Sequence, residues 1–251
     1  TQVRWRETAA MLRTRFPVDV HANAATYEIQ FGHLERPTHR NTTWDLARDE
    51  VAAHKWVDLS QRDFGVALLN DAKYGHKIKD NVIDLNLLRS APYPGTNRLV
   101  DADFPEGEPH HGYTDQCDHV FTYALYPHAG DAVEGGVIHA GYDLNVPLRV
   151  TATSPHAGEA PQRRSLLAVD TAGVIVEAVK RAEDGGDIIV RLYEATGASV
   201  DATVTCDFPV AAAAEADLME TPLHAVSVTD GRVALSFTPF EIKTLRLTPE
   251  A

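Results

Sequence analysis

The chain has 251 residues and a formal net charge of −13, with 36 acidic against 23 basic residues. Hydrophobic residues make up 44% and charged residues 24%, an ordinary balance for one large or two modest globular domains. The acidic balance argues against a nucleic-acid partner, because phosphate binding requires a basic face. No apolar run approaches the roughly 20 residues of a membrane-spanning helix, so we expect no membrane partner. The two cysteines, Cys117 and Cys206, are too few for a disulfide framework, and we expect reduced thiols.

Apolar residues in the first third of the chain alternate with the period of two that is typical of half-buried β-strands. The segments with this pattern are Phe16–Val20, Tyr27–Phe31 and Ile83–Leu88. The continuous apolar run Phe64–Leu69 suits a fully buried strand. The segment Leu46–Lys55 has a loose helical pattern, so its type stays open on periodicity alone.

The middle of the chain has less regular patterning. Residues 90–118 are rich in Pro, Gly, Asp and Glu, which predicts a long surface connection. His119–Tyr126 is then expected to form a strand, and Leu148–Val150 a short one. Ala132–Tyr142 stays open, because two adjacent glycines cost a helix roughly 2 kcal/mol relative to alanine.

A change in the residue pattern of the sequence indicates a domain boundary. The polar segment Ser154–Arg164 contains two prolines, and short strand patterns with turn signals follow it. These are Val174–Val179 and Ile188–Tyr193, which flank Glu183–Gly186 as a hairpin, and then Val200–Thr205, Val233–Phe237 and Phe240–Leu247. We therefore predict a large domain at residues 1–155 and a small β-sandwich at 165–251.

Two polar loops are the candidate sites. In the first, Asn70, Asp71, Tyr74, Gly75 and His76 follow the buried run and offer donors, acceptors and a flat apolar ring that suit a sugar. Glycine allows a close backbone approach. The alternative is a turn built by Asn and Asp with a packed tyrosine, since turn chemistry explains those residues equally well.

The second loop has the sequence RPTHRNT at residues 36–42. Its arginines, Arg36 and Arg40, suit bidentate pairing with carboxylates of a partner surface. The side chains of Thr38 and Asn41 can form hydrogen bonds with the unpaired backbone groups of an irregular loop. With His39 between them, we assign these five residues to a domain interface, and we rank this structural role above substrate contact.

Metal and catalytic motifs are weak. His110 and His111 are adjacent in the Pro-Gly connection, where a solvated loop is the simpler interpretation. His119, His128 and His139 lie on different predicted elements, and we expect structural hydrogen bonds for them. Nucleophile-elbow, P-loop and dinucleotide motifs do not occur, and abundant acidic residues alone do not identify the two carboxylates of a glycosidase. From its residues alone, we do not expect the chain to be a complete enzyme.

Ordered motifs across nearly the whole chain nevertheless resemble glycoside hydrolase family 38, the α-mannosidases, and most closely their neutral, cytosolic or vacuolar branch. The motifs are QFGH at 30–33, RPTHRNT at 36–42, WD at 44–45, HKW at 54–56, GVALLND at 65–71, KYGH at 73–76, LLRS at 87–90, FTYALYPH at 121–128 and PFEIKTL at 239–245. Partly on this resemblance, we predict a strand from about Glu50 to Leu59.

The resemblance implies a fold and a role. It covers the region that follows the catalytic barrel of the family, so we expect an all-β fold: a large antiparallel β-sandwich of the supersandwich, galactose-mutarotase-like type, then a smaller sandwich. It implies an upstream catalytic barrel as partner, an α-mannoside oligosaccharide as substrate and a cytoplasmic location. It places zinc or another divalent metal in that barrel, with no metal site and no catalytic residue in this chain. The abrupt start at Thr1 fits a fragment or processed product, and a homo-oligomer is compatible with the sequence. The alternative is a free-standing carbohydrate-binding or scaffold module.

Overall fold

The computed structural model describes residues 1–93, 112–155, 157–159 and 161–250. The chain divides into two compact units, which we describe separately. Unit 1 comprises Thr1–Ile29 and Leu34–Leu148, and unit 2 comprises Gln30–His33 and Arg149–Ala251. The predicted all-β class is confirmed, because strands dominate and the helices described are short. The described helices are all too short or too polar to cross a membrane.

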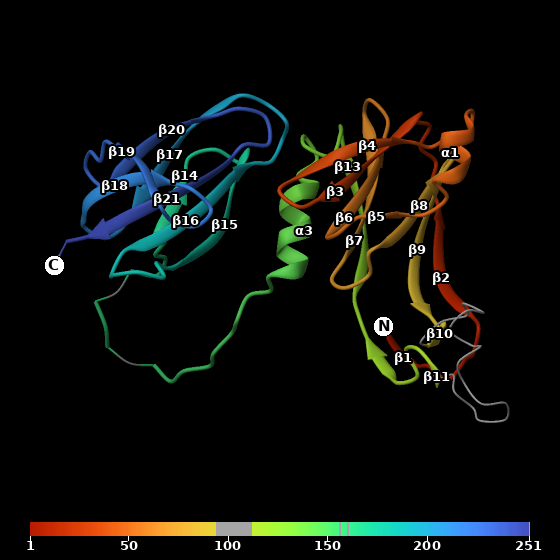
Figure 1. Cartoon of the computed structure of the whole chain (residues 1–251). Coiled ribbons are helices and arrows are strands. Elements are labelled where there is room, and N and C mark those ends of the chain that lie inside the picture. Colours follow the sequence, from red (N-terminus) through yellow and green to blue (C-terminus); the bar gives the residue numbers. More distant parts are fainter. Residues whose placement is uncertain (94–111, 156, 160, 251) are drawn as a thin grey trace, which may run out of the picture. The chain divides into compact units, whose positions relative to one another are not determined.

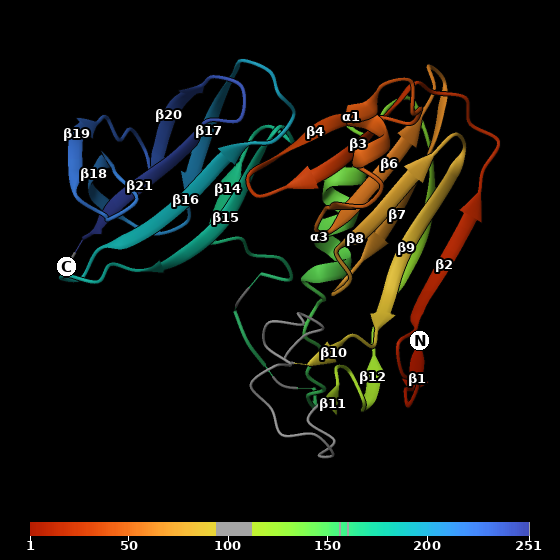
Figure 2. The same ribbon diagram turned by 45° about the vertical axis from the view of Figure 1, so that its right-hand side comes forward.

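Unit 1 is a β-sandwich of two antiparallel sheets. The five-stranded sheet has the order β13-β7-β6-β3-β4, and the four-stranded sheet has the order β2-β9-β8-β5. Figures 1 and 2 show both sheets, with helix α3 against β6 and β7. Two small ribbons, β1-β12 and β10-β11, complete the described pairing. The elements are β1 Gln2–Arg4, β2 Met11–Pro17, β3 Ala24–Ile29, β4 Gly32–Pro37, α1 Thr43–Ala47, β5 Val51–Ala52, β6 Trp56–Ser60, β7 Phe64–Asn70, β8 Gly75–Lys79, β9 Val82–Arg89, β10 Pro92–Tyr93, β11 Gly112–Tyr113, β12 Asp118–Val120, β13 Tyr123–Ala129 and α3 Val137–Asn145.

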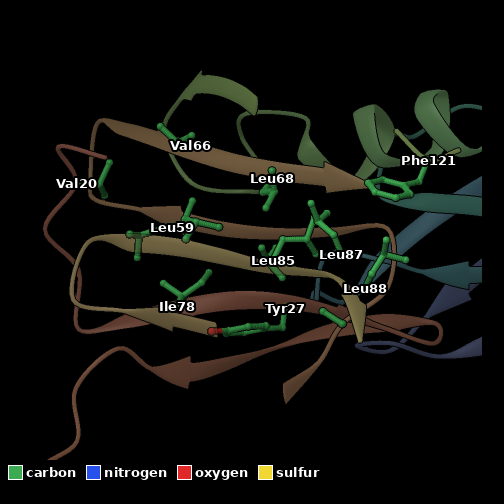
Figure 3. Close-up of a cluster of buried hydrophobic side chains, with 14 of the residues drawn as sticks. Val20, Tyr27, Leu59, Val66, Leu68, Ile78, Leu85, Leu87, Leu88 and Phe121 are labelled. Carbon is green, nitrogen blue, oxygen red and sulfur yellow. The ribbon is translucent and has the colours of Figure 1, made fainter. Parts of the chain in front are cut away.

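The core of unit 1 is the apolar layer between its two sheets. Alternate residues of each strand point into this layer, as the period of two requires. Figure 3 shows Leu59 and Leu68 from one sheet facing Ile78 and Leu85 from the other, with Tyr27 at the edge of the cluster. Burying a side chain of this size contributes roughly 1.5–3 kcal/mol, so this layer is the main source of stability of the unit.

The predicted strand from Glu50 to Leu59 is wrong as a single element. The chain forms β5, crosses between the sheets at Ala53–Lys55, and continues as β6. Long-range hydrogen bonds fix the crossing: the backbone N–H of Ala53 donates to the Tyr74 carbonyl, and that of Lys55 donates to the buried carboxylate of Glu28. These partners, Tyr74 and Glu28, lie far away in the sequence, so the residue pattern of the segment itself could not predict the crossing. The helix that the pattern of Leu46–Lys55 allowed is present only as the short α1, which ends before β5.

Helix α3 resolves the ambiguous segment with two glycines. The helix begins at Val137, directly after Gly136, whose φ of 70° is left-handed. The glycine pair therefore precedes the helix, and its propensity cost does not apply. Val137, Ile138 and Gly141 form the buried face of α3. A Cβ atom at Gly141 would lie 2.7 Å from Cδ1 of Trp56, so glycine permits the close approach of helix and sheet.

Unit 2 is a smaller sandwich of a five-stranded sheet, β15-β16-β21-β18-β19, and a three-stranded sheet, β14-β17-β20. Figure 1 shows both sheets in blue and teal. The predicted hairpin is confirmed, because β15 pairs with β16 in antiparallel register. Val190, Leu192, Val204, Val233 and Leu245 belong to its buried core. The strands are β14 Leu167–Val169, β15 Val174–Arg181, β16 Ile188–Glu194, β17 Val200–Cys206, β18 Val210–Ala216, β19 Pro222–Val226, β20 Arg232–Phe237 and β21 Ile242–Pro249.

Three smaller strand predictions need correction. The strand predicted at Phe16–Val20 lies earlier, as β2, because Val18 leaves the ladder to bond with Asn81. The predicted strand His119–Tyr126 is broken in two by Phe121 and Thr122, which bond to Thr1 and Asp71. Leu148–Val150 is not a strand. The domain limits 1–155 and 165–251 stay a prediction.

Candidate functional site

Asn70 ends β7 and anchors the first candidate loop from inside the protein. Its side chain is fully buried. The amide Nδ2 donates to the His54 carbonyl at 2.7 Å, and Oδ1 accepts from the Lys73 backbone N–H at 2.7 Å. The Asn70 carbonyl accepts from Nδ2 of Asn145 in α3 at 2.9 Å. Every one of these bonds is internal, so the residue fixes the path of the loop.

His76 lies on β8 and is also fully buried. Its Nδ1 atom is 3.2 Å from the Tyr74 carbonyl, while Nε2 is buried without a hydrogen-bond partner. Burial, with a smaller contribution from the neighbouring His54, lowers the pKa of His76 to about 4 in spite of the opposing hydrogen bond to Tyr74. The imidazole ring is therefore neutral near pH 7, and its position in the interior has a structural role in β8.

Asp71 and Tyr74 form the outward part of this loop. Oδ1 of Asp71 accepts from the backbone N–H of Thr122 at 2.9 Å, which leaves its second oxygen free of described partners. Tyr74 is 49% exposed, and its ring centroid lies 5.0 Å from that of His54. Gly75 begins β8, where a Cβ atom would lie 2.9 Å from Nδ2 of Asn86. A carboxylate and a braced aromatic ring thus face outward, a combination that suits a sugar.

Thr38, His39 and Asn41 of the second loop bond within unit 1. The Thr38 hydroxyl donates to the Ala22 carbonyl at 2.7 Å. Nδ1 of His39 accepts weakly from the Asn41 backbone N–H at 3.4 Å and lies 3.7 Å from the Asp45 carboxylate. Arg40 forms an ion pair with Asp49. These bonds hold the loop in place, and they leave Arg36 as the charged residue of the predicted set without a carboxylate partner among the described residues.

Arg36 lies in a pocket that this loop shares with α1, β5 and β8. Its guanidinium carbon is 5.6 Å from the ring centroid of Tyr27, and its Nε atom is buried without a hydrogen-bond partner. We call this cavity the basic pocket. Its lining residues are Tyr27, Arg36, Pro37, Thr38, His39, Arg40, Asp45, Arg48, Asp49, Val51, Lys77, Ile78 and Lys79.

Sequence reasoning missed the contribution of β8 to this pocket. Lys77 and Lys79 lie on the same face of β8, two residues apart, and both line the pocket. Lys77 pairs with Asp49 at 2.8 Å. Burial and the nearby Arg40 and Arg13 guanidinium groups hold the pKa of Lys77 below its ordinary value, in spite of its acidic neighbours. The alternation of Lys77, Ile78 and Lys79 could have indicated a strand with two lysines on one face.

Metal ligands do not gather in the part of the chain that the structure describes. No group of three or more His, Cys, Asp or Glu residues there is placed to hold a metal ion. His128 bonds to Asp58 and His119 to the Asp115 carbonyl, which are structural contacts. His110 and His111 lie outside the described residues.

Two models of known protein families match this chain. Residues 1–97 match the model of the "Glycosyl hydrolases family 38 C-terminal domain", and residues 173–245 match that of the "Glycosyl hydrolases family 38 C-terminal beta sandwich domain". Both units thus contain a segment of the kind found in glycoside hydrolases of family 38.

Individual relatives agree with these models. Alpha-mannosidase 2C1 of Mus musculus is 43% identical over 98% of this chain, and Alpha-mannosidase G of Dictyostelium discoideum is 38% identical over 98%. The crystal structure of an alpha-mannosidase from Enterococcus faecalis V583 superimposes with a TM-score of 0.76 at 20% identity, covering 98% of this chain and 26% of that one, which supports the fold.

The chain belongs to glycoside hydrolase family 38 and carries its C-terminal β-sandwich region. It spans 22% of the length of either curated relative.

Proposed function

We propose that this chain is the C-terminal region of a longer α-mannosidase, which hydrolyses α-mannosidic linkages in oligosaccharides with retention of configuration. The observation that carries the proposal is the 43% identity with mouse Alpha-mannosidase 2C1 across 98% of this chain. In the proposed enzyme, the chain provides a scaffold and substrate-facing loops for a catalytic barrel that precedes it.

Retaining glycosidases require two carboxyl groups about 5–5.5 Å apart, one as acid and one as nucleophile. The buried acids of this chain have structural partners instead. Glu28 bonds to Lys55, Asp58 to His128, and Asp84 to Arg13. We therefore assign the catalytic carboxylates to the preceding barrel. Zinc or another divalent metal would bind in that barrel.

The substrate-facing part of the chain is the loop from Asn70 to His76. Asn70, Gly75 and His76 hold the backbone, and Asp71 and Tyr74 present a carboxylate and a half-exposed ring. In this proposal the Tyr74 ring stacks on the apolar face of a mannose unit while its hydroxyl hydrogen-bonds to the sugar, and Asp71 accepts a hydrogen bond from a sugar hydroxyl. Asn41 is exposed in the second loop, and we keep residues 36–41 as the surface that adjoins the barrel.

We also propose a cytoplasmic location. Cys117 and Cys206 are both free thiols, and they lie in different units. Unpaired cysteines are typical of a reducing compartment.

The coding region immediately upstream of the Thr1 codon tests the proposal. We expect a continuous reading frame long enough to encode a catalytic barrel. A start codon directly before Thr1 would contradict it and favour a free-standing carbohydrate-binding module.

A further inference from the structure

The basic pocket has a charge opposite to that of the chain as a whole. Five Lys and Arg side chains line it, against two Asp side chains. The full chain carries a net charge of −13. Cations that gather around a cavity on an acidic protein repel one another, and this arrangement costs free energy unless an anion compensates it.

The two acids of the pocket are already engaged. Asp49 pairs with Arg40 and with Lys77. Asp45 accepts from the Thr42 hydroxyl at 2.8 Å and lies 3.7 Å from His39.

Three cations of the pocket have no such partner. Arg36, Arg48 and Lys79 line the cavity, and none of them forms an ion pair with a described residue. Arg36 is the least compensated of the three, because its buried Nε also lacks a hydrogen-bond acceptor. Leaving a buried donor unsatisfied costs about 1–3 kcal/mol, more for a charged group. The ring of Tyr27 supports one face of the guanidinium and leaves its edge for an acceptor.

The size of the cavity limits the ligand. Its volume is about 30 Å³, whereas one water molecule needs roughly 10–15 Å³ on the same scale. A tetrahedral oxyanion fits such a space, and a mannose ring does not. Three uncompensated positive charges suit a dianion better than a single carboxylate. The chain as a whole is acidic, which disfavours an anionic lipid membrane as the source of the anion.

We propose that the basic pocket of unit 1 binds a small phosphate dianion, either inorganic phosphate or the phosphate group of a small phosphate ester. Arg36 donates to it through the edge of the guanidinium, in the bidentate geometry that phosphate favours. Lys79 and Arg48 flank it as further positive charges. The site is separate from the loop Asn70–His76 and does not depend on glycosidase activity.

Isothermal titration of the purified chain with inorganic phosphate, in chloride buffer at constant ionic strength, tests the site. We expect saturable 1:1 binding that weakens as salt rises. Arg36→Gln should weaken phosphate binding at least tenfold. Arg36→Lys should have an affinity between those of the parent and Arg36→Gln, since lysine keeps the positive charge but lacks the bidentate geometry of the guanidinium. Lys79→Gln and Arg48→Gln should each weaken it severalfold. Arg62→Gln is the matched control, because Arg62 is exposed in the same unit and does not line the pocket.

Arg48 keeps the test valid if Arg36→Gln fails to fold, because its side chain is exposed and has no partner to lose. No saturable binding up to about 10 mM phosphate, far above a 1 mM dissociation constant, overturns the proposal. Equal binding by the parent and by folded Arg36→Gln and Arg48→Gln variants also overturns it. Binding by this chain that disappears in the longer protein would assign the pocket to a carboxylate of the preceding domain, and it too would overturn the proposal. Phosphate and glycerol phosphate, titrated in parallel, separate the free ion from an ester.

Discussion

His128 on β13 reaches across β7 to Asp58 on β6, and its Nε2 atom lies 2.8 Å from Oδ1 of the carboxylate. Both side chains are 2% exposed. The strand between them carries Gly65 opposite His128, where a Cβ atom would lie 2.5 Å from Cε1 of the imidazole. The missing side chain of Gly65 therefore allows a buried polar bond between strands that are not neighbours.

Breaking this bond is expected to destabilise unit 1. His128→Leu leaves the Asp58 carboxylate buried with only Ser60 beside it, and removing one partner of such a pair costs about 3–5 kcal/mol. Urea denaturation measures this change in the free energy of unfolding. His21→Ala, at an exposed site, should change it by less than about 0.5 kcal/mol. A double variant with Asp58→Asn should cost less than the sum of the single changes, and strict additivity would count against the bond.

Gly65→Ala should also destabilise the unit, by about 1–3 kcal/mol, because the new methyl group overlaps the His128 ring. The same denaturation experiment applies. Gly186→Ala is a suitable comparison, since a Cβ atom there meets nothing within 4 Å. Equal stability of the two glycine variants would refute the steric explanation.

Glu194 should make unit 2 sensitive to acid. Its buried carboxylate accepts from the backbone N–H groups of Thr196, Gly197 and Phe240 at 2.7–3.0 Å. Burial alone would raise the pKa of Glu194, but these hydrogen bonds outweigh it and hold the pKa below its ordinary value of 4.5. A depressed carboxyl pKa contributes stability that is complete above the unfolded value and is lost as the pH falls through the folded value.

Glu194→Gln is therefore expected to cost about 2–3 kcal/mol at pH 7, because an amide nitrogen would face backbone donors. The difference from the parent should shrink as the pH falls below 4.5. Thermal unfolding between pH 3 and pH 7 measures this. Glu183→Gln, at a side chain that is 81% exposed, serves as the control. A Glu194→Gln penalty that stayed constant over this range would show that the charge is not responsible.

Gly141→Ala sets helix propensity against packing in α3. Alanine should favour the helix by about 1 kcal/mol. The methyl group would lie 2.7 Å from Trp56, and overpacking of this kind costs about 1–3 kcal/mol. We expect net destabilisation, measured by the free energy of unfolding. Asp143→Ala, on the exposed face of the same helix, isolates propensity and should not destabilise. A stabilised Gly141→Ala variant would mean that α3 does not pack closely on β6.

The substrate-facing role of the first loop can be tested in the longer enzyme. Tyr74→Phe removes a hydroxyl group that has no described partner, and Asp71→Ala removes a carboxylate. Each should lower kcat/KM about 10- to 100-fold, since one polar contact contributes about 1–3 kcal/mol. Thermal stability should change little for Tyr74→Phe. Tyr113→Phe and Glu35→Ala, both exposed, are the controls. Values of kcat/KM within twofold of the parent would favour a purely structural turn.

The sequence predicts best the strands that are richest in buried apolar residues. β7 and β9 have the expected limits to within a residue or two, because their apolar pattern reports the sandwich core directly. The crossing at Ala53–Lys55 was not predictable, since Glu28 and Tyr74 fix it from distant positions. The two candidate loops were found as polar segments. The basic pocket was not, because Arg48 and Lys79 join Arg36 only through the packing of α1 and β8.

Assay of aryl α-mannoside hydrolysis by the purified 251-residue chain, beside the longer protein, tests the central claim most directly. We expect turnover by the longer protein and none by the chain alone, with or without added zinc or cobalt, because the catalytic carboxylates and metal site are assigned to the preceding barrel. Metal-dependent hydrolysis by the chain itself, retained after removal of contaminating glycosidases, would contradict the account.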